Sequence, residues 1–373
     1  MIRKSVEPNM VTYFHTVGRK NGTPVAGTFE ITAQCNFNCP MCYVHMSEEE
    51  IRKSGKELTA EQWLSIAKKA RDRGMIFALL TGGEPFVRKD FFEIYKGMKE
   101  LGLVVSINSN GSMLRGSILE KLLADPPFRI NISLYGGSND TYRNMCGIPA
   151  YDQVKENIRK LRAAGIEVSL NLSITPFNCK DIGRIYQDAC DLNVNVRASS
   201  YMYPPIRING EEYGTGNRLS AEDAALYSVE WDILRFTPEE FAIRAENTAK
   251  LICNEPEGCS VDEGDGVRCR AGSTSFWMTW DGKMLPCGMM TEPVVYPLEV
   301  GFDNAWDSIR EQTSRIRTPA ECVTCDHREV CANCAAVCYA ETGTFDAVPS
   351  YVCKKTREQV RITVEKFNER KQL

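Results

Sequence analysis

The residues best placed to do chemistry are three cysteines near the start of the chain, Cys35, Cys39 and Cys42, spaced as C-x3-C-x2-C. Three thiolates on one short loop can ligate three irons of a cubane cluster, and the fourth iron is then open to an exogenous ligand. Because an electron carrier normally has all four irons capped, the open iron indicates chemistry on a bound molecule. A zinc knuckle or a redox dithiol is the competing interpretation, but the nearest imidazole, His45, is poorly spaced for zinc.

A second group of cysteines lies in the last third of the chain. The candidate ligands there are Cys259, Cys269, Cys287, Cys322, Cys325, Cys331, Cys334, Cys338 and Cys353. The chain has 16 cysteines, and clustered cysteines in a protein of this kind more often hold metals than form disulfides. A pair of structural zinc sites is the alternative, because two C-x2-C units are a common zinc pattern.

Composition excludes several classes of protein. The chain of 373 residues is 43% hydrophobic and 25% charged, as in ordinary globular proteins. A net charge of −4 and the lack of a long basic run argue against nucleic acid as a partner. No apolar stretch is long enough to span a membrane, and the first residues lack the apolar core of a signal peptide. We therefore expect a cytoplasmic protein.

The elements that must position these cysteines follow an alternating pattern. Apolar runs bounded by turn residues predict six strands, at 27–33, 76–80, 103–108, 129–134, 167–172 and 195–199. Helical periodicity predicts helices at 58–73, 90–101, 151–164 and 180–192. Thr59 and Gln62 form a predicted capping box, and Gly74, Gly102 and Gly165 stand at expected helix ends.

Six alternating strands and helices predict an α/β fold with a parallel sheet. Ligands in such folds collect at the C-terminal edge of the strands, where the cysteine triplet after the first strand must lie. We divide the chain into a barrel at 1–215, a helical linker at 216–252 and a cysteine-rich domain at 253–373. The linker is expected to break near Pro238, and a closing helix is predicted at 356–372.

The first two strands carry a resemblance to the radical S-adenosylmethionine (SAM) superfamily. Its signature is C-x3-C-x2-C after the first barrel strand, and Gly82-Gly83-Glu84-Pro85 after the second strand matches its GGEP motif. The resemblance implies a partial (β/α)6 TIM-type barrel and a [4Fe-4S] cluster that binds SAM. It also implies that the glycines admit the methionine part of SAM, and that Glu84 accepts from its amino group. Reductive cleavage would give a 5′-deoxyadenosyl radical that abstracts hydrogen, with a flavodoxin or ferredoxin as reductant.

Further cofactor contacts follow from the same resemblance. Ser106, Asn108 and Asn110 would bind the ribose, and Ser133 and Arg143 would lie near the cofactor carboxylate. Tyr43 follows the third cysteine, whereas the position before that cysteine, often aromatic in the family, is Met41. Methionine is still a soft apolar cover for a cluster.

The C-terminal cysteines resemble the SPASM extension, which carries two auxiliary [4Fe-4S] clusters and brings the expected total to three. On that pattern Cys322, Cys325, Cys331 and Cys353 hold the outer cluster. Cys269 and Cys287 hold the inner one, joined by an upstream cysteine, with Cys259 favoured over Cys253. The last inner ligand is either Cys334 or Cys338, because the usual position is Ala335.

Relatives of this architecture mostly modify peptides, so we expect a ribosomal peptide substrate that is crosslinked or epimerised. Only 34 residues precede Cys35, too few for a leader-binding domain, so a separate recognition protein is a possible partner. The 201–207 segment either lines a substrate cleft or packs as a linker. Asp281 and Cys146 are weak candidates for a base and a hydrogen donor. Gly288 replaces the Asp that formylglycine-forming enzymes carry, which weakens that reading.

Two alternatives to a peptide-modifying enzyme remain at this point. The same radical chemistry could act on a small metabolite. The chain could instead be a non-catalytic iron–sulfur or zinc protein, but Glu84 and an open three-cysteine site count against that.

Overall fold

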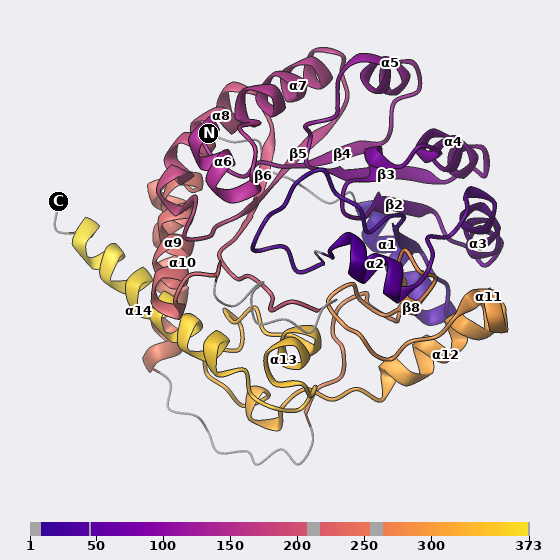
Figure 1. Cartoon of the computed structure of the whole chain (residues 1–373). Coiled ribbons are helices and arrows are strands. Elements are labelled where there is room, and N and C mark those ends of the chain that lie inside the picture. The colour runs from indigo at the N-terminus through magenta and orange to yellow at the C-terminus, as the bar shows by residue number, and fades with distance from the viewer. Residues whose placement is uncertain (1–8, 45, 207–216, 254–263, 372–373) are drawn as a thin grey trace.

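The computed structural model describes residues 9–44, 46–206, 217–253 and 264–371 (Figure 1). Its strands are β1 (Ala26–Glu30), β2 (Phe77–Thr81), β3 (Val104–Ser109), β4 (Arg129–Ser133), β5 (Val168–Ser173), β6 (Asn195–Ser199), β7 (Ser275–Met278) and β8 (Met284–Leu285). Its helices are α1 (Asn9–Asn21), α2 (Glu48–Ser54), α3 (Ala60–Asp72), α4 (Phe91–Glu100), α5 (Gly116–Ala124), α6 (Asn139–Cys146), α7 (Tyr151–Ala163), α8 (Ile182–Asp191), α9 (Ala221–Arg235), α10 (Pro238–Cys253), α11 (Pro297–Val300), α12 (Phe302–Ser314), α13 (Ala335–Thr342) and α14 (Ser350–Lys371).

The sheet is a curved array in the order β6-β5-β4-β3-β2-β1-β7-β8. Strands β1 to β6 are parallel, each paired with the next along the chain, which confirms the predicted α/β fold. In Figure 1 the helices α3, α4, α5, α7 and α8 form a ring outside this sheet. The carboxyl ends of the strands therefore meet at one edge, where the loops that follow them come together.

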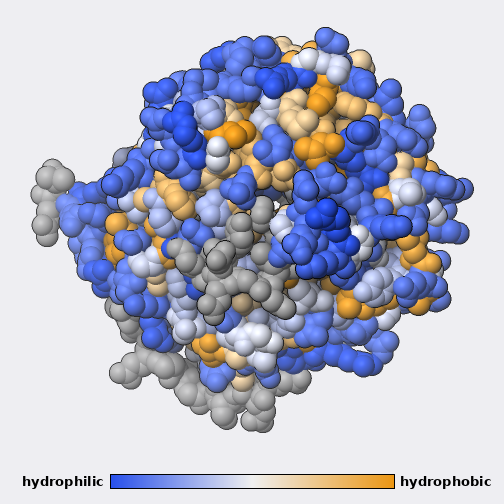
Figure 2. Space-filling view, in the orientation of Figure 1, coloured by the Kyte–Doolittle hydropathy of each residue, from blue (hydrophilic) through white to orange (hydrophobic). Residues whose placement is uncertain are grey.

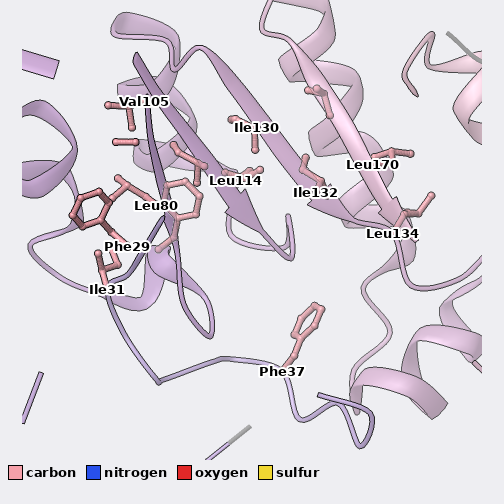
Figure 3. Packing of buried hydrophobic residues seen from close by; sticks show 14 of the residues in the cluster. Phe29, Ile31, Phe37, Leu80, Val105, Leu114, Ile130, Ile132, Leu134 and Leu170 are labelled. Carbon is pink, nitrogen blue, oxygen red and sulfur yellow. The ribbon is translucent and has the colours of Figure 1, made fainter. Parts of the chain in front are cut away.

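Strand alternation separates an apolar outer face from a polar inner face. Figure 3 shows Leu80, Val105, Ile130 and Leu170 on neighbouring strands, all of them buried in one core cluster. Helix side chains such as Ile158 belong to the same cluster, so the outer face is what the helices cover. The alternate residues of each strand face the inside of the barrel.

The predicted elements of the first two hundred residues are confirmed, with ends that differ by a few residues. The capping box of α3 is present in both directions, with Gln62 N to Thr59 Oγ1 at 3.2 Å and Thr59 N to Gln62 Oε1 at 2.9 Å. Gly74, Gly102 and Gly165 follow helices with φ of 105°, 82° and 80°, where a side chain would be strained.

The C-terminal part joins the barrel through β7, which pairs in parallel with β1 on the side away from β2. Sequence reasoning missed this strand, and it also missed α1, whose His15 Nδ1 lies 2.8 Å from Thr274 Oγ1. The predicted division at residue 253 stays a prediction, but residues beyond it complete the same sheet.

The last helix, α14, begins at Ser350 rather than at the predicted residue 356, so it carries Cys353. It packs on α9 and α10 through a cluster that includes Val229, Phe241 and Ile362. The predicted break between α9 and α10 falls at Phe236-Thr237, as expected before Pro238.

Hydrophilic side chains cover most of the face in Figure 2, with smaller hydrophobic areas between them. Among the helices that the structure describes, none has the length and apolar character needed to cross a bilayer.

Candidate functional site

The segment that leads to Cys35 is held against the Gly82-Gly83-Glu84 turn by backbone pairing. Gly83 N donates to Thr32 O at 2.9 Å, and Glu84 N donates to Gln34 O at 2.8 Å. A Cβ on Gly83 would lie 2.3 Å from Gln34 O, and one on Gly82 would lie 2.4 Å from Thr32 O. Both glycines are thus required by the close approach of the cysteine-bearing segment, a role that the resemblance had not indicated.

Glu84 is fully buried at this edge, and both of its oxygens accept hydrogen bonds. Asn110 N donates to Oε2 at 2.7 Å, Ser109 Oγ lies 2.9 Å from Oε1, and Phe86 N donates to Oε1 at 3.3 Å. Burial raises the pKa of Glu84 to about 7, against the lowering effect of these three donors. A carboxyl group in this state ionises readily beside a cationic ligand.

The cysteine loop is ordered by short-range contacts and by the end of β3. Cys42 N donates to Cys39 O at 3.0 Å, and Phe37 N lies 3.4 Å from Cys35 Sγ. Asn110 reaches the same thiol with Nδ2 at 3.9 Å and also donates to Asn36 Oδ1 at 2.8 Å. The loop therefore brings Cys35 close to Glu84 and keeps Cys39 and Cys42 close to Cys35, as ligation of one cluster and its exogenous ligand requires.

The predicted ribose and carboxylate contacts divide into two groups. Ser106, Asn108 and Ser133 lie on the inner face, Asn108 and Ser133 at or near the carboxyl ends of β3 and β4 and Ser106 deeper, in the row of Arg129. Arg143, on α6, is 56% exposed and pairs with Asp140 at 2.6 Å. Its place near the cofactor carboxylate stays a prediction.

Cys146 is buried against the cysteine loop and does not open onto the edge. Its carbonyl oxygen accepts from Asn38 N at 3.2 Å, and its side chain is 1% exposed. A hydrogen bond with Cys146, together with burial, raises the pKa of the Cys39 thiol. A role as hydrogen donor to substrate would need access that this position lacks.

Asp281, the other weak catalytic candidate, lies in the turn between β7 and β8. Its two oxygens bind Thr279 Oγ1 at 2.6 Å and Lys283 Nζ at 2.7 Å. These contacts make it a residue of the turn.

Seven of the C-terminal cysteines surround a single cavity of about 520 Å³. They are Cys269, Cys287, Cys322, Cys325, Cys331, Cys334 and Cys353. Cys338 is fully buried just behind this lining: its thiol lies 3.3 Å from Nδ2 of the lining residue Asn333, which also lies 3.6 Å from Cys322 Sγ. Of the two cysteines left open by the spacing, Cys334 lines the cavity directly and Cys338 lies close to it, so the choice between them stays a prediction.

The upstream ligand lies outside what the structure describes, since Cys259 falls in 254–263 and no side-chain position is described for Cys253. The fourteen cysteines that are described are all free thiols. No three His, Cys, Asp or Glu side chains within the described ranges are grouped to hold a single metal ion. The seven thiols in this lining have the donor chemistry of iron–sulfur ligation, which takes one thiolate per iron.

Tyr203 connects the two cysteine regions. Its ring centroid lies 6.4 Å from that of Tyr43, next to Cys42, and its ring borders the C-terminal cavity. Burial, with Cys334 and Cys287 close by, raises the pKa of Tyr203 well above its usual range. The neighbouring Tyr201 donates to Glu341 Oε1 at 2.7 Å, so the described part of 201–207 packs as a linker.

Sequence reasoning missed Ser109, Tyr135 and Tyr203. Tyr135 lies beside Cys39 and Cys146 and bonds Ser133, and its ring is 6.4 Å from that of Phe37. The only signal for Ser109 and Tyr135 was their position just before or after the end of a strand. For Tyr203 the signal was the aromatic 201–207 segment, which the sequence allowed either to line a substrate cleft or to pack as a linker.

Comparisons with known proteins agree with this geometry. The family model described as the radical SAM superfamily matches residues 29–189. The chain is 27% identical over 335 residues to the AdoMet-dependent heme synthase of Methanosarcina barkeri, covering 85% of this chain and 93% of that protein. It is 35% identical over 288 residues to the "Probable GTP 3',8-cyclase" of Saccharolobus islandicus, covering 76% of this chain and 88% of that protein.

Two solved structures share the fold along most of the chain. Streptococcus suis SuiB bound to precursor peptide SuiA has a TM-score of 0.65 at 16% identity, covering 94% of this chain and 82% of that one. Native anSMEcpe with bound AdoMet has a TM-score of 0.66 at 14% identity, covering 93% and 98%. At these identities the likeness shows the fold alone.

Proposed function

The chain belongs to the radical SAM superfamily, and from that premise we propose that it cleaves SAM reductively and abstracts hydrogen from a peptide substrate. The observation that carries the proposal is the loop of Cys35, Cys39 and Cys42 at the carboxyl edge of the sheet, with Cys35 close to the buried Glu84. When bound, a [4Fe-4S] cluster supplies the electron that splits SAM into methionine and a 5′-deoxyadenosyl radical.

The residues of the chain act by binding and positioning. Cys35, Cys39 and Cys42 would hold the cluster, and Glu84 would accept a hydrogen bond from the SAM amino group while its carboxylate balances that charge. Ser106, Asn108 and Ser133 would face the ribose and carboxylate from the inner face. Tyr135 and Phe37 would pack over the buried side of the loop, beside Cys39.

The C-terminal cavity would hold auxiliary clusters. Two are proposed, with Cys322, Cys325, Cys331 and Cys353 on one and Cys269, Cys287 and Cys334 on the other. The cavity in which these seven thiols meet supports this assignment. A flavodoxin or ferredoxin is the proposed reductant, and a separate leader-recognition protein is a proposed partner.

A peptide substrate is supported by the solved structures that share this fold, because SuiB was solved with precursor peptide SuiA and anSMEcpe with the Cp18Cys peptide. A small anionic metabolite is the second candidate. It is favoured by the names of the curated relatives, a heme synthase and a GTP 3′,8-cyclase, which match the chain at higher identity.

The test compares wild type with Cys39→Ala after anaerobic reconstitution with iron and sulfide. With dithionite and SAM, wild type should form 5′-deoxyadenosine and the variant should form none. Four irons per cluster give about 12 irons per chain for wild type and about 8 for the variant.

Cys190→Ala is the matched control, since Cys190 is a half-buried thiol on α8 outside both cysteine regions. It should match wild type in both measurements. Wild-type protein that takes up iron but never yields 5′-deoxyadenosine would refute the radical chemistry, and wild type with only about 4 irons would refute the auxiliary clusters.

A further inference from the structure

The inner face of the sheet is polar across four neighbouring strands. Asn108, Asn131, Ser169 and Asn195 lie side by side in the register of β3 to β6. Asn131 Nδ2 donates to Asn108 Oδ1 at 2.8 Å, and Ser169 Oγ donates to Asn195 Oδ1 at 2.5 Å. A barrel that filled its own interior would carry apolar side chains here, so this face is suited to a polar ligand.

Two arginines lie on the same face and have no acidic partner in an ion pair among the described residues. Arg129 and Arg197 are in phase with Asn131 and Asn195 along β4 and β6. Arg129 is half-buried, and its Nε has no hydrogen-bond partner. Arg197 is exposed although it lies within a strand.

The nearby carboxylates are engaged elsewhere. Glu167 acts on Arg129 electrostatically but forms its ion pair with Arg162 at 3.3 Å. Glu30, on the inner face of β1, accepts from Trp277 Nε1 at 2.9 Å. Burial and repulsion from Arg197 lower the pKa of Arg129, so the two positive charges influence each other.

Asn131 provides a further unsatisfied group between the two arginines. Its side chain is 7% exposed, and its Oδ1 has no hydrogen-bond partner. Buried polar atoms in native structures are nearly always paired, so an unpaired acceptor on the same face as the two arginines is suited to a ligand with a donor of its own.

We propose that Arg129 and Arg197 form a subsite that binds an anionic group of the substrate, a carboxylate or a phosphate, while Asn131 Oδ1 accepts from an adjacent N–H or O–H. Guanidinium groups bind both anions with paired N–H donors. The subsite rests on the proposed function, because it deepens the identity of the substrate of that reaction.

The strand register also sets the depth of the two arginines on the inner face. Arg197 is level with Asn171 and Ser133, whereas Arg129 lies four residues further from the carboxyl edge, or roughly 13 Å along the sheet. The subsite would therefore extend from the carboxyl edge down the inner face.

The experiment titrates reconstituted holoenzyme calorimetrically, at low ionic strength, with three probes: pyrophosphate, glutarate and a capped Gly-Glu-Gly peptide. At least one should bind wild type, and Arg129→Gln and Arg197→Gln should each weaken that binding about tenfold or more. Arg159→Gln is the matched control, since Arg159 pairs with Glu156 on the exposed side of α7. It should bind as wild type does.

The preferred probe identifies the source of the anion: a phosphorylated metabolite, a carboxylated metabolite or an acidic peptide. Absence of binding for all three probes, or equal binding by wild type and Arg197→Gln, overturns the subsite. Thermal unfolding followed by circular dichroism checks that each variant is folded. If Arg129→Gln does not fold, the binding measured for Arg197→Gln alone tests the subsite, because Arg197 is exposed. Anion binding without 5′-deoxyadenosine formation would instead refute the proposed function and leave the subsite standing.

Discussion

Glu84 is a buried carboxyl group whose pKa the fold raises to near neutral pH. Burial raises its pKa, and the donors from Asn110, Ser109 and Phe86 limit the rise. The result is a group whose pKa of about 7 differs from its ordinary value of 4.5. A cationic ligand beside it would draw the group into its charged form, so ligand binding and proton release are coupled at this residue.

This shift predicts a pH dependence of stability. Between about pH 4.5 and 7 the folded protein keeps a proton on Glu84 that the unfolded chain has released. The free energy of unfolding contributed by Glu84 should therefore fall as pH rises through this window, by about 3 kcal/mol in all. Urea unfolding of cluster-free protein across the window measures the effect.

Glu84→Gln is the control for this prediction, because an amide of the same size does not titrate. Its unfolding free energy should lack this part of the pH dependence. Equal slopes for wild type and Glu84→Gln would show that Glu84 is already ionised in the folded protein.

Sequence motifs predicted the position of some site residues but gave no indication of others. The spacing of Cys35, Cys39 and Cys42 and the turn at Glu84 are local in sequence, so a pattern could place them at one edge. Tyr203 and Cys334 meet only through packing of distant segments. Spacing could not separate Cys334 from Cys338 as the last inner ligand, and both lie at or near the cavity, so that assignment stays a prediction.

At the scale of elements, the extension of β1 against the turn after β2 fixes the cysteine loop. The pairing works because no side chain stands between Gly83 and the carbonyl oxygen of Gln34. A backbone carbonyl cannot move aside from a new Cβ as easily as the tip of a flexible side chain can. The glycine is therefore a structural requirement of the loop.

Gly83→Ala should cost about 2–3 kcal/mol of stability, since the new Cβ would meet the Gln34 carbonyl at 2.3 Å. It should also lower iron retention at the three-cysteine loop. Gly183→Ala is the control: a Cβ there meets nothing within 4 Å, and stability should stay the same or rise by up to ~1 kcal/mol. Equal unfolding midpoints for the two variants would contradict the steric argument.

Element prediction from sequence succeeded where contacts are local. The strands β1 to β6 have apolar outer faces and helices between them, and these patterns are visible in short windows. Strand β7 was not predicted because its identity as a strand depends on pairing with β1, far away in sequence. The four residues of β7 carry too little periodicity to reveal this.

At the scale of the whole molecule, a buried ion pair ties the C-terminal part to the barrel. Arg218 lies 2.6 Å from Glu341 on α13, with side chains 13% and 8% exposed. The Arg218 guanidinium also lies 3.9 Å from the ring centroid of Tyr351 on α14, and Tyr201 donates to Glu341. Three segments of the chain meet at this one carboxylate.

Glu341→Gln should lower the free energy of unfolding by about 3 kcal/mol, because it leaves the Arg218 charge buried without its partner. Glu222→Gln is the matched control, since Glu222 pairs with Lys354 on the surface and both side chains are about half exposed; its cost should stay below ~1 kcal/mol. Urea unfolding of both variants checks this. A smaller loss for Glu341→Gln than for Glu222→Gln would contradict it.

The pairing of β1 with β7 also bears on how the protein is made. On the ribosome, β1 to β6 emerge well before Ser275–Met278, so the barrel first exists with the edge of β1 unpaired. An unpaired edge is a template for wrong association until its partner arrives. Translation must therefore pass residue 278 before β7 can pair with β1 and complete the sheet next to the cysteine loop. A nascent chain that pauses earlier still has this open edge and is the form most in need of a chaperone.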